Sequence, residues 1–298
     1  MSVIPLMVGI GGVLALLLVL TVVALMGLHL GLRAPKILSD ETPVEFAPDY
    51  QSVVIPSVDD VSMQAWWLAH AHAVHTIVVV HGWGSNRAQM LPFARVFFQA
   101  GYNVLLFDAR NHGHSERAGH SSMPRFAQDI SHALAWLRQY HPLSAQKIAL
   151  LGHSVGASAA ILEASRRTDI DALISVSAFA HPEWLMKRFF LSKHIPAWLA
   201  IGFNRYIQWV IGHPFDEIAS VHALPRVHCP VLLIHGQMDA VVPIEDARIL
   251  YQTSSGQNVQ LWEIPLAGHS DVELIETYRV PLVSFLQNVG FCPVTHVK

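Results

Sequence analysis

Residues 147–166 combine a strand, a sharp turn and a helix in a way that few folds accommodate. Residues 147–151 are apolar enough for a buried strand, and residues 157–166 are rich in the Ala, Leu and Glu typical of a helix. Between them lies a Gly-x-Ser-x-Gly sequence that runs from Gly152 to Gly156. This pattern places a serine, here Ser154, on a strained turn with its hydroxyl raised above the edge of a sheet. The alternative interpretation is an ordinary glycine- and serine-rich turn.

The two glycines of this turn have a predicted steric role. A side chain at Gly152 or Gly156 would collide with the neighbouring strand and helix, and glycine also tolerates unusual dihedral angles. The start of the helix points backbone N–H groups at whatever Ser154 attacks, which favours developing negative charge at that point. The stretch therefore predicts a nucleophile.

Composition limits the classes of function. The chain has 298 residues, of which 52% are hydrophobic and 14% are charged, so it can bury one large core or two modest ones. A formal net charge of −3 and the lack of long basic runs argue against a nucleic-acid partner. The two cysteines, Cys229 and Cys292, lack the spacing of metal ligands, and no disulfide framework is expected.

Histidines are numerous, and the tightest group is His70, His72 and His75. This group lies between two strand-like segments, residues 62–68 and 76–80, and is therefore predicted to occupy a hairpin turn. No carboxylate or cysteine joins it, so a metal site is not expected there.

The amino-terminal segment, residues 3–32, has no lysine, arginine or carboxylate and consists mainly of Leu, Val, Ile and Ala. A bilayer core requires about 20 such residues in a helix. A cleaved signal peptide and a buried core helix are the alternatives, but no basic leading region or small-residue cleavage site is present. We therefore expect residues 1–35 to form an uncleaved single-pass membrane anchor. Arg33 and Lys36 follow the segment, which predicts that the rest of the chain lies in the cytoplasm.

Beyond residue 48, strand-like and helix-like segments alternate, which predicts an α/β fold with a mostly parallel sheet and helices on both faces. Asn86 or Ser85 is expected to cap the first helix. The strand at 76–80 is continuously β-branched, as in an inner strand covered on both faces. The expected strands are residues 52–55, 62–68, 76–80, 102–107, 147–151, 172–177, 230–234 and 259–264, and the expected helices are residues 87–100, 124–140, 157–166, 244–252 and 271–288.

Three motifs occur in the order and spacing found in α/β-hydrolases: HGWG at residues 81–84, DARNHGHS at 108–115 and GHSVG at 152–156. The chain resembles the serine-hydrolase branch that includes membrane-anchored bacterial members and esterase-, lipase- and peptidase-like enzymes. The resemblance covers roughly residues 50–290, and residues 36–298 are expected to form one α/β-hydrolase domain. Three motifs in register are more specific than any one alone.

The resemblance implies a catalytic triad in the chain order serine, acid, histidine. It assigns the nucleophile to Ser154, the acid to Asp239, which follows the strand at 230–234, and the base to His269 in the loop after the strand at 259–264. His153 and His235 are rival histidines that we expect to have packing or supporting roles. A turn or capping role is the alternative for Asp239.

The resemblance also implies an oxyanion hole made of two backbone N–H groups, those of Val155 and Trp83. The Asp108, Arg110 and His112 side chains could be mistaken for a second catalytic set. In the family this loop mainly braces the sheet edge, so a structural role is expected for all three.

Residues 181–224 form an insertion between the strands at 172–177 and 230–234, rich in aromatic residues and poor in charge. It resembles the small helical cap that covers the serine in many hydrolases, where it would form an apolar pocket for substrate. Ordinary packing of two helices against the sheet is the alternative, and both can hold.

The sequence therefore predicts a membrane-tethered serine hydrolase that cleaves a small-molecule or lipid-like carboxylic ester or thioester through an acyl-enzyme on Ser154. No metal or organic cofactor is expected. The same triad serves peptidases and acyltransferases, so these activities remain alternatives. A catalytically inactive membrane-bound binding module is a third. The motifs determine neither the natural substrate nor the oligomeric state.

Overall fold

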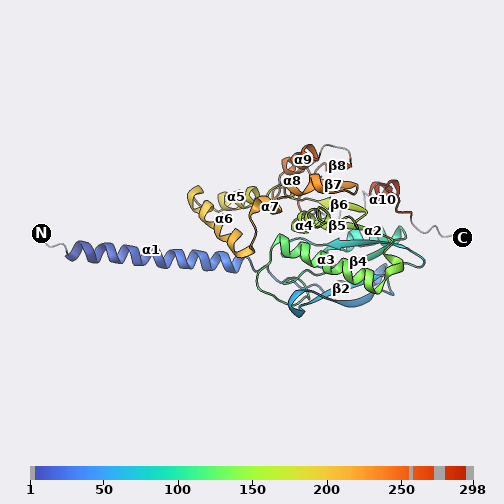
Figure 1. The fold of residues 1–298 in the computed structure, drawn as a ribbon, viewed down its shortest axis with the longest axis horizontal. Coiled ribbons are helices and arrows are strands. Elements are labelled where there is room, and N and C mark those ends of the chain that lie inside the picture. Colours follow the sequence, from blue (N-terminus) through green and yellow to red (C-terminus); the bar gives the residue numbers. More distant parts are fainter. Residues whose placement is uncertain (1–3, 255–257, 272–278, 293–298) are drawn as a thin grey trace.

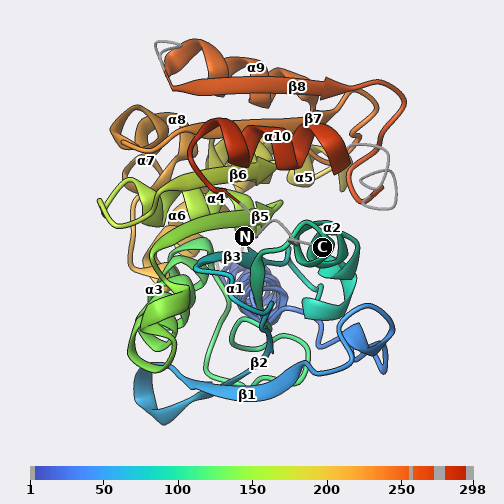
Figure 2. The same ribbon diagram turned by 90° about the vertical axis from the view of Figure 1, so that its right-hand side faces the viewer.

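The computed structural model describes residues 4–254, 258–271 and 279–292. Its centre is one sheet of eight strands in the order β1-β2-β4-β3-β5-β6-β7-β8, with helices on both faces (Figures 1 and 2). Only β2 runs antiparallel to its neighbours β1 and β4, and the remaining pairs are parallel. The predicted mostly parallel sheet is confirmed. The strands are β1 (Gln51–Pro56), β2 (Ser62–Leu68), β3 (His75–Val80), β4 (Asn103–Phe107), β5 (Lys147–His153), β6 (Ala172–Val176), β7 (Val231–Gly236) and β8 (Val259–Ile264).

The predicted hairpin between the second and third strands is wrong. β4 lies between β2 and β3 and pairs with both. Residues 69–74 therefore connect two strands, β2 and β3, that are not neighbours in the sheet. Alternating strand-like segments do not reveal which neighbour each strand takes. Consecutive strands are neighbours in only about two-thirds of cases, and here a later strand lies between them.

The helices agree with the sequence expectations in type, with small shifts at their ends. The helix expected at 87–100 begins as a 3₁₀ turn (Arg87–Met90), and Asn86 caps it by accepting from the Ala88 and Gln89 N–H groups. The last expected helix is observed over its final ten residues, and its 272–278 part lies outside the described residues. The α-helices are α1 (Ile4–Gly31), α2 (Leu91–Gln99), α3 (Met123–Tyr140), α4 (Val155–Ala164), α5 (Pro182–Ser192), α6 (Ala197–Ile211), α7 (Phe215–Ile218), α8 (Ser220–Ala223), α9 (Ile244–Thr253) and α10 (Arg279–Asn288).

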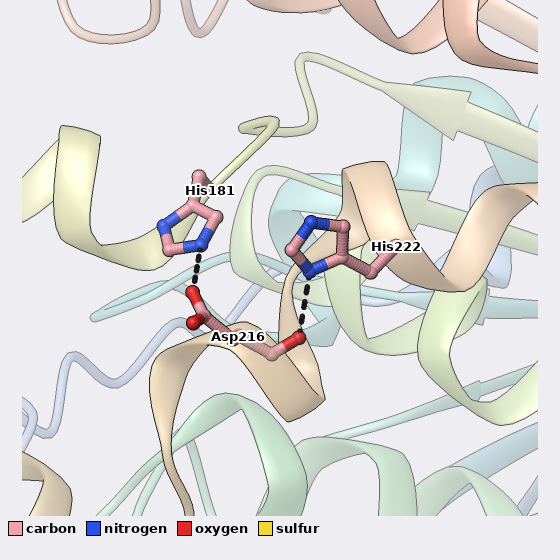
Figure 3. Close-up of side chains that lie close together, drawn as sticks. All are labelled: His181, Asp216 and His222. Carbon is pink, nitrogen blue, oxygen red and sulfur yellow. Dashed lines mark hydrogen bonds and ion pairs between the residues drawn. The ribbon is translucent and has the colours of Figure 1, made fainter.

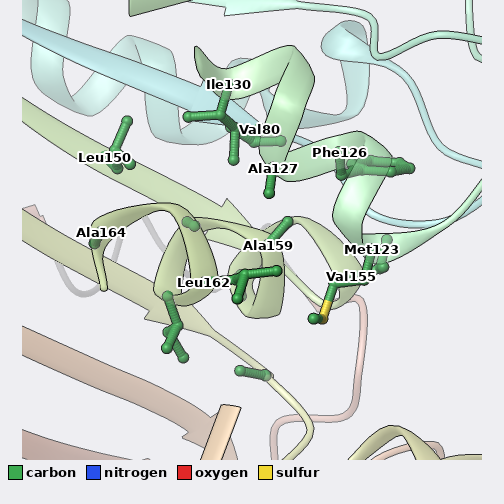
Figure 4. Packing of buried hydrophobic residues seen from close by; sticks show 14 of the residues in the cluster. Val80, Met123, Phe126, Ala127, Ile130, Leu150, Val155, Ala159, Leu162 and Ala164 are labelled. Carbon is green, nitrogen blue, oxygen red and sulfur yellow. The ribbon is translucent and has the colours of Figure 1, made fainter. Parts of the chain in front are cut away.

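Two apolar clusters cover the two faces of the sheet. Along β3, Val78 and Val80 belong to one cluster, whereas Ile77 and Val79 belong to the other, because strand side chains alternate between faces. Figure 4 shows the first cluster, in which α3 and α4 pack against β3 and β5. The predicted inner strand, buried on both faces, is confirmed.

Helix α1 stands away from the body, with only its carboxyl-terminal end in contact with it (Figure 1). Residues 12–31 are long and apolar enough to cross a membrane, and none of the apolar window is buried against the rest of the chain. At the contact with the body, Tyr206 Oη lies 3.3 Å from His29 Nδ1.

Residues 181–224 form α5, α6, α7 and α8 between β6 and β7. Phe190 of α5 is buried, and its ring centroid lies 5.6 Å from that of Phe203 of α6. The two longer helices therefore pack on one another as well as on the body.

Candidate active site

Ser154 lies on the sharp turn between β5 and α4. Its φ of 55° and ψ of −120° are outside the regions that most residues adopt, which costs about 1–3 kcal/mol. The backbone holds this conformation in part because the Ser154 N–H donates to the Val176 carbonyl oxygen at 2.8 Å. The Ser154 side chain does not cap α4, so its hydroxyl is available to another partner.

Close packing of the backbone around this turn requires glycine at two positions. A Cβ atom at Gly152 would overlap the backbone of Gly156, and a Cβ atom at Gly156 would overlap the backbone of His81 at the end of β3. The first turn of α4 therefore touches the ends of two adjacent strands, as the sequence predicts. This contact determines where Ser154 lies relative to the sheet edge.

Three side chains from separate loops meet at this edge. The Ser154 hydroxyl donates to His269 Nε2 at 3.0 Å, and His269 Nδ1 donates to Asp239 Oδ2 at 2.7 Å. The residues follow β5, β7 and β8, whose carboxyl ends lie at one edge because the strands are parallel. The arrangement can transfer the hydroxyl proton to the imidazole while the carboxylate holds the ring in position.

The buried carboxylate of Asp239 has three close contacts besides His269. Its Oδ1 atom accepts from the Val241 and Val242 N–H groups at 2.9 and 2.8 Å, and its side chain has no exposed area. His235 Nε2 lies 3.4 Å from Oδ2. Burial alone would raise the pKa of Asp239, but hydrogen bonds from His235, His269 and Val242 outweigh it and hold the pKa well below its ordinary value.

The two rival histidines support the other residues. His153 Nε2 donates to the backbone carbonyl oxygen of His269 at 2.7 Å, which ties the loop bearing His269 to the turn bearing Ser154. His235 Nε2 donates to the Val242 carbonyl oxygen at 2.7 Å beside Asp239. Burial lowers the pKa of His153 to about 4, so its ring stays neutral near pH 7. The sequence predicts a supporting role for both, but their partners are defined only by the fold.

A cavity of about 490 Å³ opens beside the Ser154 hydroxyl. Its wall includes Trp83 and His269, together with Ile37 and Glu41 from the segment that follows α1. Val155 is the first residue of α4, so its N–H group has no acceptor within the helix, and it directly follows Ser154. Val155 follows the serine in sequence, and Trp83 lines the same cavity as Ser154.

The insertion at 181–224 supplies none of the described residues that line this cavity. The substrate pocket expected from this insertion stays a prediction. Phe190, Ala200 and Ile207 belong to the core cluster, so part of these helices packs as the alternative describes. Ile37 and Glu41, from the segment 37–41, form part of the cavity wall.

The loop at 108–115 braces the structure, as expected. Asp108 is fully buried and accepts from the Arg87 and His114 N–H groups at 2.7 and 2.8 Å, while its Oδ2 atom pairs with the Arg87 guanidinium at 3.1 Å. Arg110 forms a buried ion pair with Asp129 at 2.7 Å. These contacts join the loop to helices on its two sides.

A second cluster, His181, Asp216 and His222, has the residue types of a metal site (Figure 3). His181 Nδ1 accepts from the Glu183 N–H at 3.2 Å, so its Nε2 carries the proton that it donates to Asp216 at 2.9 Å. With a metal on Nε2 the neutral ring would carry its proton on Nδ1, which could then no longer accept from the Glu183 N–H. The present contacts therefore suit hydrogen bonds and not a metal. Its contacts instead join the start of α5 to α7. In the described part of the chain, His70, His72 and His75 form no comparable group.

Comparison with known proteins adds a family context to this geometry. Residues 71–219 match the family model Hydrolase_4, described as serine aminopeptidase, S33. The alpha/beta hydrolase domain-containing protein aho-3 of Caenorhabditis elegans is 29% identical over 213 residues, which cover 71% of this chain and 57% of that protein. The membrane protein YNL320W of Saccharomyces cerevisiae is 25% identical over 260 residues, which cover 84% of each chain.

Among solved structures, the chain is similar to the esterase Pf2001 of Pyrococcus furiosus. The two share 25% sequence identity with a TM-score of 0.72, over 86% of this chain and 96% of that one. The likeness covers nearly the whole esterase.

Replacing Gly156 by Ala should destabilise the chain, because the new methyl group would overlap the His81 and Val80 carbonyl oxygens. Overpacking of this kind costs about 1–3 kcal/mol, and more where backbone must move. The matched control is Gly202→Ala in α6, where a Cβ atom meets nothing within 4 Å and helix propensity predicts a gain of about 1 kcal/mol. Urea unfolding of both variants measures the difference, and equal free energies of unfolding would contradict the steric role.

Acidification should lower stability partly through His81. Its Nδ1 donates to the Gly82 carbonyl oxygen and its Nε2 accepts from the Ala109 N–H, so the folded ring has no site for a second proton. Burial lowers its pKa to about 4, below the value of 6.5 in the unfolded chain. The unfolded chain therefore binds more protons between these values, and stability is lost as the pH falls from 6.5 towards 4.

The non-titrating variant His81→Gln isolates this contribution. The free energy of unfolding of the parent chain should fall more steeply across that pH range, by up to about 1.4 kcal/mol per pH unit for this one proton. Urea unfolding at several pH values measures both slopes. Identical slopes would show that His81 is not the group responsible.

Proposed function

The chain belongs to the α/β-hydrolase superfamily, and on that premise we propose that it is a serine hydrolase that cleaves a carboxylic ester or thioester. The contacts of His269 carry the proposal: Nε2 lies 3.0 Å from Ser154 Oγ, and Nδ1 lies 2.7 Å from Asp239 Oδ2. The similarity to an esterase at 25% identity over most of both chains supports the same chemistry. No step needs a metal or organic cofactor.

In the first half of the reaction, Ser154 Oγ attacks the substrate carbonyl carbon while His269 Nε2 takes the hydroxyl proton. The carbonyl oxygen becomes an oxyanion, which the N–H groups of Val155 and Trp83 stabilise. His269 then gives the proton to the leaving alcohol or thiol as its bond to the acyl carbon breaks. Asp239 holds the imidazole and stabilises its charged form, helped by its own lowered pKa.

In the second half, a water molecule attacks the acyl group on Ser154. His269 takes one proton from the water, and the bond between the acyl carbon and Oγ breaks. The proton returns to Oγ, so the product acid leaves and the serine is restored. His153 keeps the loop of His269 in place throughout through its bond to the His269 carbonyl oxygen.

A lipid-like ester is the substrate class that the surroundings favour. The cavity next to Ser154 is partly walled by Ile37 and Glu41, which come six and ten residues after the end of α1 at Gly31. If α1 spans a bilayer, the reacting serine lies on the membrane-facing side of the body. An acyl chain leaving the bilayer would then have a short route to the cavity.

A serine peptidase is the second candidate. The matching family model carries a serine aminopeptidase description, and the same three side chains serve amide hydrolysis. The ester is preferred because the solved structure with 25% identity is an esterase.

Residues 1–35 act as the membrane anchor in this proposal, and residues 36–298 form the hydrolase domain with an insertion at about 181–224. The apolar length of residues 12–31 and the similarity to a yeast membrane protein support the anchor. Arg33 and Lys36, which follow α1, support a cytoplasmic position for the hydrolase domain.

Replacing Ser154 by Ala should abolish hydrolysis of p-nitrophenyl esters and labelling by a fluorophosphonate probe. Loss of the nucleophile typically costs about 10⁶-fold in kcat, because the acyl-enzyme can no longer form. Ser165→Ala at the far end of α4 is the matched control, since its hydroxyl bonds only locally to the Leu162 carbonyl oxygen. Parallel assays with ester, thioester and peptide p-nitroanilide substrates separate the two candidates.

The outcome that would reject the mechanism is ester turnover by the Ser154→Ala protein at the parent rate. Faster cleavage of peptides than of esters would favour the peptidase. Loss of activity in Ser165→Ala as well would indicate a folding defect rather than loss of a nucleophile.

The orientation of the anchor predicts where a carboxyl-terminal reporter is active. A green fluorescent protein fused there should fold and fluoresce in the cytoplasm, whereas alkaline phosphatase at the same position should be inactive. The opposite pattern would place the hydrolase domain on the far side of the membrane.

A further inference from the structure

The outward surface of α5 and α6 is unusually apolar. Large side chains that a soluble fold would normally bury are between 38 and 77% exposed here. On α6 the exposed positions recur at helical spacing and so share one face. Exposed apolar side chains gathered on two helices that pack together favour an interaction site. Its members are Trp184, Phe189, Leu191, Trp198, Ile201 and Trp209, and we refer to it as the α5–α6 surface.

The charge of α5 and α6 is mainly basic. Residues 182–211 contain four lysines or arginines and one carboxylate, Glu183 at the start of α5, although the whole chain has a net charge of −3. Arg188 is paired with Asp246, but Lys187, Lys193 and Arg205 are exposed among the apolar side chains. Tryptophan and basic residues together are typical of the headgroup region of a bilayer, where aromatic rings lie at the interface and basic groups attract anionic lipids.

The α5–α6 surface is continuous with the contact that α1 makes on the body. Tyr206 of α6 lies 3.3 Å from His29 near the end of α1, and Leu28 and Leu32 pack against the cluster that contains Ile207. Figure 1 shows α5 and α6 on the side of the body from which α1 projects, beside its carboxyl-terminal end. A bilayer crossed by α1 would therefore meet α5 and α6 before the rest of the body.

We propose that the α5–α6 surface docks on the bilayer that α1 crosses, with its tryptophans in the headgroup region and its basic side chains on anionic lipid headgroups. This inference rests on the membrane anchor of the proposed function and not on the chemistry of Ser154. Two contacts, α1 and α5–α6, would limit rotation of the body about a single helix. Because Ile37 and Glu41 connect α1 to the cavity wall, docking would hold the cavity at a constant height above the lipid.

The test places an environment-sensitive fluorophore at single cysteines in the full-length chain, reconstituted in vesicles. Cys292→Ser removes the exposed native thiol, and Cys229 is buried. Trp198→Cys and Trp209→Cys report on the α5–α6 surface. The control is Leu143→Cys, a position that is 79% exposed. It adjoins Ser144, whose carbonyl oxygen accepts from Thr76 near the amino end of β3, at the other end of the parallel strands from Ser154. Vesicles contain phosphatidylcholine alone or mixed with phosphatidylglycerol, with and without a nitroxide-labelled lipid.

We expect blue-shifted emission at positions 198 and 209 that the nitroxide lipid quenches, more strongly with phosphatidylglycerol, and water-like emission at position 143. Lys193→Glu should weaken the preference for phosphatidylglycerol about fivefold or more, since each basic group near an anionic surface contributes about that factor. Arg279→Glu, an exposed charge beside Gln99 on another helix, should leave it unchanged.

Water-like emission at positions 198 and 209 in every vesicle would overturn the proposal. Blue-shifted emission that the nitroxide lipid does not quench would also overturn it, because protein, such as a second copy of the chain, would then cover the surface. Release of the chain from vesicles at alkaline pH would remove the anchor on which the proposal rests. Loss of ester turnover alone would bear only on the proposed chemistry.

Discussion

A single buried carboxylate, that of Asp239, connects the parts of the candidate site. Burying one charge without partners would cost several kcal/mol, so the loop after β7 is shaped to supply them. Two backbone N–H groups from Val241 and Val242 satisfy one oxygen, and His269 donates to the other. The hydrogen bond to this carboxylate orients the His269 ring so that its other nitrogen, Nε2, contacts Ser154.

The backbone at the carboxyl ends of the strands also holds the three side chains of the candidate site in place. Parallel strands bring β5, β7 and β8 to one edge, and glycine at positions 152 and 156 lets α4 approach the ends of β3 and β5. His153 then links the turn of Ser154 to the loop of His269. The unusual backbone at Ser154 is held by the bond from its N–H to the Val176 carbonyl oxygen and by the close packing at Gly152 and Gly156.

The sheet edge that carries Ser154 lies on the same side of the body as α1. The candidate site, the segment 37–41 and the α5–α6 surface all lie on the part of the body next to the apolar helix. The insertion between β6 and β7 resembles a substrate cap by sequence, yet Trp184, Phe189, Trp198 and Trp209 are exposed and do not line the cavity. Composition alone cannot separate these two uses, because an apolar pocket and a lipid-facing surface need the same residue types.

Local features could be predicted from the residues alone: which segments are strands or helices, the sharp turn at Ser154, the glycines beside it and the apolar helix before the fold. These depend on periodicity, propensity and steric limits that act over a few residues. Three features could be seen only in the fold: β4 lies between β2 and β3, His153 and His235 have their particular partners, and Trp198 and Trp209 of α6 are exposed. Each of these depends on packing between segments far apart in the chain, and such packing leaves no periodic signal in the sequence.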